Sequence, residues 1–236
     1  MNFLEFIPLT RLANIEYEVP IPASKTIPAW YKSIPQFVNG EESLRVIPRS
    51  QGTNGTIKRC TPFLDAMIVG YMVCLADDVQ VQISETGDPE IWWRTTAGLI
   101  TYHNAEQYPG VPIPEGYCPT VFKWENGFSI QTPKGYSLYC TQPANRFDLP
   151  FLTFSGFVDT DGYTNAIKFP FFIRKGFTGI IPRGTPVAQL LPVKRDNWTS
   201  KTRKFDQDWV LRSEKHFFGV IDRAYKTLFW KKKTYQ

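Results

Sequence analysis

Apolar and polar residues alternate through the middle of the chain, which is the pattern of half-buried β-strands. Val79, Val81 and Ile83 fall on one side of such a strand, while residues 80, 82 and 84 are polar. A strand with one buried face shows this period of two residues. A second strand is predicted at EIWWRTT, residues 90–96, where it follows the turn sequence Gly-Asp-Pro. The pattern therefore indicates a sheet in this part of the chain.

Further strands are predicted between closely spaced turn sequences. Asn126-Gly127 is typical of a tight hairpin turn, and Pro133-Lys-Gly is typical of a second turn. Three strands are expected around these turns, at about 120–125, 128–132 and 136–142. Two longer apolar segments, 166–173 and 185–193, continue the series, and a short strand is possible at 180–181. The number of short strands favours a mainly β domain.

Helical spacing is confined to three places. Thr61-Pro62 is a typical start for a short helix over about 62–69, and Pro28 is typical of the first turn of a helix over about 28–34. Near the C-terminus, apolar residues at 210, 217, 220, 221, 224 and 228 recur at helical intervals. These predict one amphipathic helix from about Asp208 to Trp230, packed on the β domain by its apolar side.

These elements give a fold prediction with three parts. We expect a proline- and aromatic-rich arm at 1–54, a β domain at 55–200, and a C-terminal helix with a basic tail at 201–236, packed on the β domain. Short strands separated by Gly and Pro turns favour a β-clip or a distorted jelly-roll barrel. The arm has few internal contacts to gain, so we expect it to pack on a neighbour, with Trp30 and Tyr31 as its interface residues.

Composition and charge narrow the range of partners and compartments. Apolar residues make up 42% of the 236 residues, enough for a sizeable core, and aromatics make up 15%. The net charge is +5, with lysines and arginines gathered late in the chain, so a contact between the basic tail and nucleic acid is possible although a solvated surface is the simpler interpretation. No apolar run is long enough to span a membrane, and the N-terminus does not resemble a secretory signal.

The four cysteines are widely spaced, which excludes the common cysteine motifs for zinc binding and redox chemistry. Cys60, Cys74, Cys118 and Cys140 form no C-x-x-C pair and lie far from the two histidines. A zinc site is therefore not expected, and no other metal-ligand spacing appears. Scattered cysteines fit free thiols in a reducing compartment, so we expect a cytoplasmic protein, or a virion protein if the chain is a phage structural component.

One segment carries a recognisable motif. The sequence GFVDTDGY at 156–163 is followed by an apolar strand and then by GTPVAQL at 184–190. Over residues 136–195 these motifs resemble the trimeric dUTPase and dCTP-deaminase family. The whole chain also looks like a set of phage and bacterial proteins with no assigned activity. The family resemblance implies a homo-oligomer, possibly a trimer, with sites formed between subunits.

The resemblance also implies roles for individual residues. Asp159 would orient the attacking water, Tyr163 would pack on deoxyribose, and Gln189 would hold phosphate oxygens. The same resemblance places Asn145, Arg146 and Asp161 in the nucleotide site. A carboxylate that activates water and a magnesium ion that bridges phosphates would make this a nucleotide pyrophosphatase. Magnesium is expected only under this hypothesis, and no other cofactor is.

The sequence departs from the family pattern at several of these positions. Gly162 is inserted before Tyr163, Asn145 and Arg146 stand where the family has serines, and Pro186 replaces an arginine. The glycine-rich C-terminal arm of the family is replaced by the predicted helix. Two hypotheses therefore stay open. The first is a non-enzymatic, phage-type structural or assembly protein that contacts copies of itself or other virion-type proteins. The alternative is a dUTPase-like nucleotide-binding or nucleotide-hydrolysing protein that uses Asp159.

Overall fold

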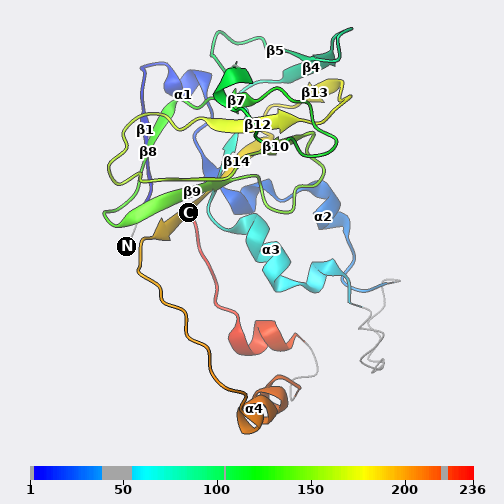
Figure 1. Ribbon diagram of the computed structural model, residues 1–236, viewed down its shortest axis with the longest axis vertical. Coiled ribbons are helices and arrows are strands. Elements are labelled where there is room, and N and C mark those ends of the chain that lie inside the picture. Colours follow the sequence, from blue (N-terminus) through cyan, green and yellow to red (C-terminus); the bar gives the residue numbers. More distant parts are fainter. Residues whose placement is uncertain (1–2, 39–54, 104, 219–222) are drawn as a thin grey trace. The chain divides into compact units, whose positions relative to one another are not determined.

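The computed structural model describes residues 3–38, 55–103, 105–218 and 223–236. By its internal contacts the chain divides into two compact units. The first, called the β unit below, comprises residues 1–26, 68–195 and 235. The second comprises residues 27–67, 196–234 and 236. Figure 1 labels helices and strands of both units where there is room.

Within its described residues, the β unit contains four antiparallel sheets. Their strands, in order across each sheet, are β1 (Glu5–Pro8) and β8 (Phe128–Gln131); β10 (Phe151–Thr153), β12 (Phe169–Ile173), β7 (Phe122–Trp124) and β6 (Ile100–Tyr102); β11 (Gly156–Val158), β9 (Tyr136–Thr141), β14 (Pro186–Lys194), β3 (Tyr71–Cys74) and β2 (Ile21–Pro22); and β13 (Gly179–Ile181), β4 (Val79–Ile83) and β5 (Pro89–Trp92). The mainly β prediction is confirmed. None of these sheets closes into a barrel within the described residues.

The helices are short. They are α1 (Ala13–Glu16), α2 (Ala29–Ser33), α3 (Thr61–Ile68) and α4 (Gln207–Phe218), accompanied by 3₁₀ turns at Ala23–Thr26, Ile57–Arg59 and Ala105–Gln107 and a π-helical turn at Tyr225–Phe229. Within the described residues no helix has the length and apolar character needed to cross a membrane. The single helix expected from 208 to 230 is replaced by α4 and the separate π-helical turn, and Arg223 between them has a positive φ of 49°.

Aromatic side chains fill the core of the β unit. Trp124 stacks on Phe171 with ring centroids 3.7 Å apart, and Phe151 meets Trp124 edge to face at 5.0 Å. All three side chains are almost completely buried. Val79 and Val81 of β4 are buried while Gln80 and Gln82 are exposed, as the alternating pattern predicts. Burial of such rings is a main source of stability in a sheet-rich core.

The predicted hairpin at Asn126-Gly127 is wrong. Strands β7 and β8 on either side do not pair with each other: β7 pairs with β6 and β12, and β8 pairs with β1. The Asn126 side chain is buried, accepts a hydrogen bond from the Phe128 N–H at 2.9 Å and donates to the Ile167 carbonyl. Gly127 is needed because a Cβ there would lie 2.4 Å from the Tyr17 ring. The Asn-Gly pair thus connects β7 of one sheet to β8 of another.

The N-terminal residues predicted to form an arm join the sheets of the β unit in part. Strand β1 pairs with β8, and β2 pairs with β3. In the second unit, Tyr31 of α2 is buried and stacks on Phe63 of α3, with ring centroids 6.0 Å apart. Residues 39–54 of the predicted arm lie outside the described residues. The domain boundaries at 54 and 200 stay predictions.

Candidate functional site

The Asp159-Thr160-Asp161 motif forms a tight turn after β11. The N–H groups of Gly162 and Tyr163 both donate to the Asp159 carbonyl, at 3.1 and 3.0 Å. Thr160 is completely buried, and its hydroxyl lies 2.8 Å from that of Thr132. Thr160 thus points inward, while the flanking Asp159 is exposed. The motif is therefore anchored to the segment between β8 and β9.

Arg195, just after β14, joins both carboxylates. Its Nη1 donates to Asp159 Oδ1 at 3.2 Å and to Asp161 Oδ1 at 3.0 Å, and its Nη2 donates to Asp161 Oδ2. The same Nη1 also donates to the Tyr136 carbonyl at 3.0 Å, and Ser137 Oγ donates to Asp159 Oδ1 at 2.6 Å. We call Asp159, Asp161, Ser137 and Arg195 the acid–arginine cluster.

The electrostatics of the cluster favour the charged form of Asp161. The hydrogen bond from Arg195, together with one from the Gly135 N–H at 2.9 Å, lowers the pKa of Asp161 to about 2. In turn the hydrogen bond to Asp161 raises the pKa of the Arg195 guanidinium. An aspartate held by an arginine and a backbone N–H is a poor proton acceptor, because its charged form is already stabilised. Asp161 is thus a structural partner of Arg195 in this turn.

Asp159 is more exposed to solvent than Asp161. Its side chain is exposed, and it accepts hydrogen bonds at Oδ1 from Ser137 and Arg195. Orienting a water molecule toward a phosphate would require a bound phosphate close to this carboxylate. Within the described residues no group of three or more His, Cys, Asp or Glu side chains is placed to hold a metal ion.

Gln189 of β14 is an internal bridge. It is 1% exposed; its Oε1 accepts from the Ala144 N–H at 2.9 Å, and its Nε2 donates to the Val69 carbonyl at 2.7 Å. Both ends of the amide are therefore used to hold backbone that lies outside the sheet. The Gln189 side chain positions the loop after β9.

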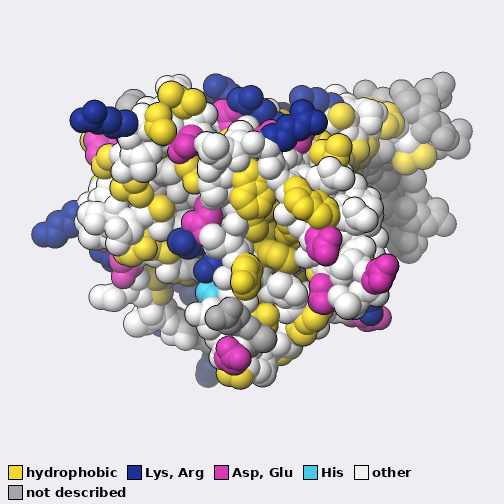
Figure 2. All heavy atoms as spheres, turned by 90° about the horizontal axis from the view of Figure 1, so that it is seen from above, with side chains coloured by type: hydrophobic (Ala, Val, Ile, Leu, Met, Phe, Trp, Pro, Cys, Tyr) yellow, Lys and Arg dark blue, Asp and Glu magenta, His cyan; other side chains and the backbone are white. Residues whose placement is uncertain are grey.

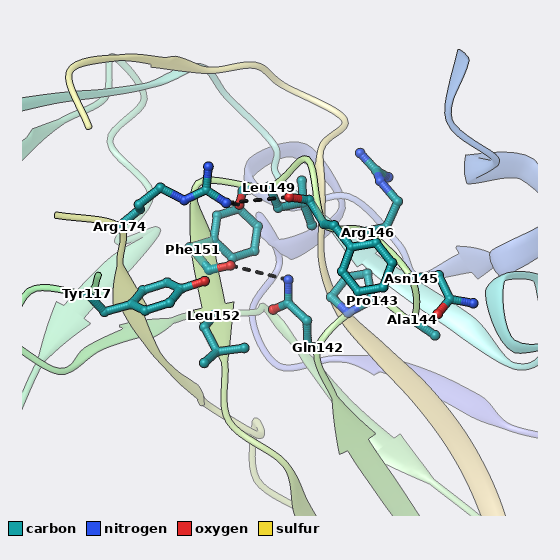
Figure 3. Close-up of a pocket in the computed structure, with 11 residues that line it drawn as sticks. Tyr117, Gln142, Pro143, Ala144, Asn145, Arg146, Leu149, Phe151, Leu152 and Arg174 are labelled. Atoms are coloured by element: carbon teal, nitrogen blue, oxygen red, sulfur yellow. Dashed lines mark hydrogen bonds between the residues drawn. The ribbon is translucent and has the colours of Figure 1, made fainter. Parts of the chain in front are cut away.

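That loop forms one wall of a pocket of about 460 Å³. Asn145 and Arg146 line it, and Asn145 has a positive φ of 58°, a conformation that asparagine tolerates better than most residues. Figure 3 shows Tyr117 and Arg174 across the pocket from the 143–146 segment. Pockets of 300–1,000 Å³ are typical for small ligands.

The two arginines of the pocket differ in their partners. Arg146 forms a bidentate pair with Asp148, at 2.8 Å for each bond, and its side chain is 12% exposed. Arg174 is exposed, and its Nη2 makes long hydrogen bonds of 3.4 and 3.3 Å to the carbonyls of Phe147 and Leu149. Arg174 is thus the cation of this pocket with more remaining capacity for an anion.

The structure brings only some of the predicted site residues together. Asn145 and Arg146 both line the pocket, and Gln189 holds the lining residue Ala144 by accepting a hydrogen bond from its N–H. Asp159, Asp161 and Tyr163 do not line it. Tyr163 is partly exposed, and its carbonyl accepts a hydrogen bond from Gln131 Nε2 at 2.7 Å.

Sequence reasoning missed Arg195, Arg174 and Tyr117. Arg195 follows an apolar strand in a basic stretch, where it looks like ordinary surface charge, and only the pairing of β14 with β9 brings it to the turn. Tyr117 and Arg174 form an isolated bridge between two distant segments. No local sequence signal marks such a pair, because the contact is created by topology.

Comparisons with known proteins give no family assignment. No protein-family model matches the chain. No curated protein matches it either. Among solved structures, a variant dUTPase from phage phi11 of S. aureus is 16% identical over 55% of this chain and 98% of its own, with a TM-score of 0.29. A second phi11 dUTPase structure, described for its species-specific insert, is 13% identical over 55% of this chain and 97% of its own, with a TM-score of 0.27.

A third structure gives similar values. It is a variant dUTPase of Staphylococcus bacteriophage 80alpha with dUpNHpp, 13% identical over 55% of this chain and 89% of its own, with a TM-score of 0.27. These values amount to a weak resemblance to phage dUTPases and assign neither family nor activity.

Proposed function

We propose that this chain is a non-enzymatic subunit of a phage-type protein assembly and that residues 3–15 contact a neighbouring copy. The observation that carries the proposal is the exposed apolar surface of these residues. Ile15 is 80% exposed and Leu12 54%, and Phe3, Ile7 and Leu9 are also exposed. Five exposed apolar side chains within thirteen residues are typical of an interaction site.

The backbone of the same segment supports this role. Strand β1 is paired with β8 on one side and has no strand partner on the other in the described sheet. An edge strand of this kind offers unpaired N–H and C=O groups to another chain. Hydrophobic side chains are also exposed elsewhere, among the charged groups on the face shown in Figure 2. Residues 3–15 combine both features within a short stretch.

The state of the motif residues supports a non-enzymatic role. Asp161 is held by Arg195 and the Gly135 N–H, and both ends of the Gln189 amide bind backbone groups of this chain. A side chain with these hydrogen bonds would have to break them before it could bind a phosphate group. Trp30, which is partly exposed, remains a proposed second contact, whereas Tyr31 is buried against Phe63 of the same chain.

The proposal is tested by measuring molar mass with size-exclusion chromatography and light scattering. Wild-type protein should form an oligomer, and the double variant Leu12→Ser/Ile15→Ser should have a smaller mass at the same concentration. The matched control is Val111→Ser/Ile113→Ser, which removes two other exposed aliphatic side chains. A monomeric wild-type protein, or an equal loss of mass in both variants, would overturn the proposal.

A second candidate function, nucleotide binding, is favoured by the pocket that contains Arg174. Its arginines could pair with phosphate oxygens, and Tyr117 could pack on a base or sugar. Thermal stability would be measured with dUTP and dCTP, with and without magnesium. Binding in this pocket should raise the melting temperature of wild type and Asp159→Asn but not of Arg174→Gln. Pyrophosphate release that disappears in Asp159→Asn would instead identify a hydrolase and overturn the non-enzymatic proposal.

A further inference from the structure

The positive charge of the protein is concentrated near its C-terminus. Residues 196–234 contain ten lysines and arginines and five aspartates and glutamates, a net charge of +5, which equals that of the whole chain. The remaining residues therefore balance to zero. Such an excess of positive charge attracts polyanions, and Lys201, Arg203 and Lys204 supply three of the ten cations.

Aromatic side chains are interleaved with this charge. Trp198 is 86% exposed, Phe205 82% and Trp209 57%. Lys201, Arg203 and Lys204 lie between the first two in sequence. Every residue from 196 to 206 is exposed and lacks helix or strand structure, and the backbone of this stretch runs as an extended orange trace into α4 in Figure 1. We call residues 198–210 the basic–aromatic segment.

The start of α4 fixes part of this segment. Asp206 Oδ1 accepts a hydrogen bond from the Trp209 N–H at 2.9 Å, and the Asp206 carbonyl accepts from the Val210 N–H at 3.1 Å. This capping arrangement holds the corner between the extended residues and the helix. Around that corner lies a pocket of about 290 Å³ lined by Arg203, Lys204, Phe205, Asp206, Trp209 and Val210.

We infer that the basic–aromatic segment binds single-stranded nucleic acid. The pocket at Phe205 and Trp209 accepts an unpaired base, which stacks on an aromatic ring. Arg203 and Lys204 at its rim pair with the adjacent phosphates, while Trp198 and Lys201 repeat this combination further along the strand. Exposed rings combined with cations are the chemistry of sequence-tolerant single-strand binding. This inference concerns a different surface from residues 3–15 and does not depend on the proposed oligomer.

Charge and geometry favour this partner over others. A second copy of the chain offers no matching acidic excess, because its remaining residues are electrically balanced. A membrane surface favours apolar side chains gathered along one side of a helix, whereas Trp198 and Phe205 precede α4 and alternate with cations. A DNA duplex keeps its bases stacked inside, so exposed aromatic rings gain nothing from it that the cations do not already supply.

The inference is tested with the full chain by fluorescence anisotropy, using labelled 20-nucleotide oligothymidylate and a 20-base-pair duplex. Binding should be tighter to the single strand. The logarithm of the association constant should fall linearly with the logarithm of the salt concentration, with a slope of about −2, as expected for three phosphate contacts. Tryptophan fluorescence should be quenched by the single strand, because stacked bases quench indole emission.

Two variants separate stacking from charge. Trp198→Leu/Phe205→Leu removes the rings but keeps apolar side chains, and it should weaken single-strand binding about tenfold or more. Lys201→Gln/Lys204→Gln should weaken binding and reduce the salt slope by about 1.4. The matched control is Lys231→Gln/Lys232→Gln, which removes the same charge from exposed lysines of the C-terminal region and should have a smaller effect.

Several results would overturn the inference. Equal losses in both lysine variants, with no loss when the rings are removed, would show unspecific attraction to the basic region. Equal affinity for duplex and single strand would have the same meaning. Binding to phosphatidylserine vesicles without binding to oligothymidylate would identify a membrane partner. A ring-dependent change in molar mass without oligonucleotide binding would identify a second copy of the chain. Normal far-ultraviolet circular dichroism of each variant excludes misfolding as the cause.

Discussion

The acid–arginine cluster and the basic–aromatic segment differ in whether their charged groups are paired within the protein or exposed to solvent. In the cluster, Arg195 is shared among two carboxylates, a backbone carbonyl and a hydroxyl. In the basic–aromatic segment, Trp198 and Phe205 are more than four-fifths exposed among exposed cations. The region with a recognisable motif thus pairs its charged groups with one another, whereas the region without one leaves its aromatic rings and cations exposed to solvent. A motif shows which residues are present, whereas their partners decide which remain available for a ligand.

The largest effect is expected where the motif is most deeply built into the fold. Gln189→Leu leaves the Ala144 N–H and the Val69 carbonyl without their amide partner. A buried polar group left unpaired costs about 1–3 kcal/mol, and both of these groups are only partly buried, so the free energy of unfolding should fall by about 2–4 kcal/mol. Urea denaturation measures this value. Gln82→Leu on the exposed side of β4 is the control and should change it by less than about 0.5 kcal/mol.

A neutral result for Gln189→Leu would contradict the comparison. It would show that the Gln189 amide is dispensable to the fold.

A pH-dependent effect is expected for Arg195→Gln. The pKa of Asp161 is about 2 in the folded protein, below the unfolded value of about 3.9. A carboxylate with a lowered folded pKa stabilises the protein above the unfolded pKa, and this contribution is lost as the pH falls toward 2. The melting temperature of wild type should therefore fall between about pH 4 and 2 by more than that of Arg195→Gln.

Arg183→Gln is the control for this pH dependence. It breaks an exposed ion pair with Glu18 and leaves the cluster intact, so it should keep the acid-dependent loss of the wild type. If Arg195→Gln retains the full pH dependence as well, Arg195 is not what holds Asp161 charged.

A smaller effect is expected for Thr160→Val, which keeps the shape of a fully buried side chain but removes its hydroxyl. The Thr132 hydroxyl then loses its partner at 2.8 Å, and the free energy of unfolding should fall by about 1 kcal/mol. Thr164→Val, at an exposed position in the following loop, is the control. Equal values for the two variants would mean that the turn is not anchored through Thr160.

Local patterns predicted the strands well, because the period of two residues reports directly on burial. Val79 and Val81 are buried and Gln80 is exposed, and the short strand at Ile180-Ile181 is present as β13. The Asn126-Gly127 prediction failed because its local turn preference is outweighed by tertiary contacts: Asn126 bonds to Ile167, forty-one residues away. Pairing between distant segments leaves no local periodic signal.

The same limit applies to the candidate site. The sequence singled out Asp159 and Gln189 from a motif, but which groups they bond to depends on Ser137, Arg195 and Ala144, which local spacing does not place beside them. The basic cluster was visible in the sequence, whereas the exposure of Trp198 and Phe205 along an extended backbone was not. An aromatic residue in a sequence favours the core by default, so its exposure has to be seen in a structure.

The smallest effect on stability is expected in the basic–aromatic segment itself. Trp198→Ala removes the largest type of side chain, yet at 86% exposure that side chain gains little from folding, so the free energy of unfolding should change by less than about 0.5 kcal/mol. Trp124→Ala, the same substitution at a ring stacked on Phe171 in the core, should cost about 3–5 kcal/mol. The pair measures how differently the protein uses one residue type. If Trp198→Ala costs more than about 1 kcal/mol, the ring is packed in solution, the segment is not free to stack on a base, and the contrast between the two regions fails.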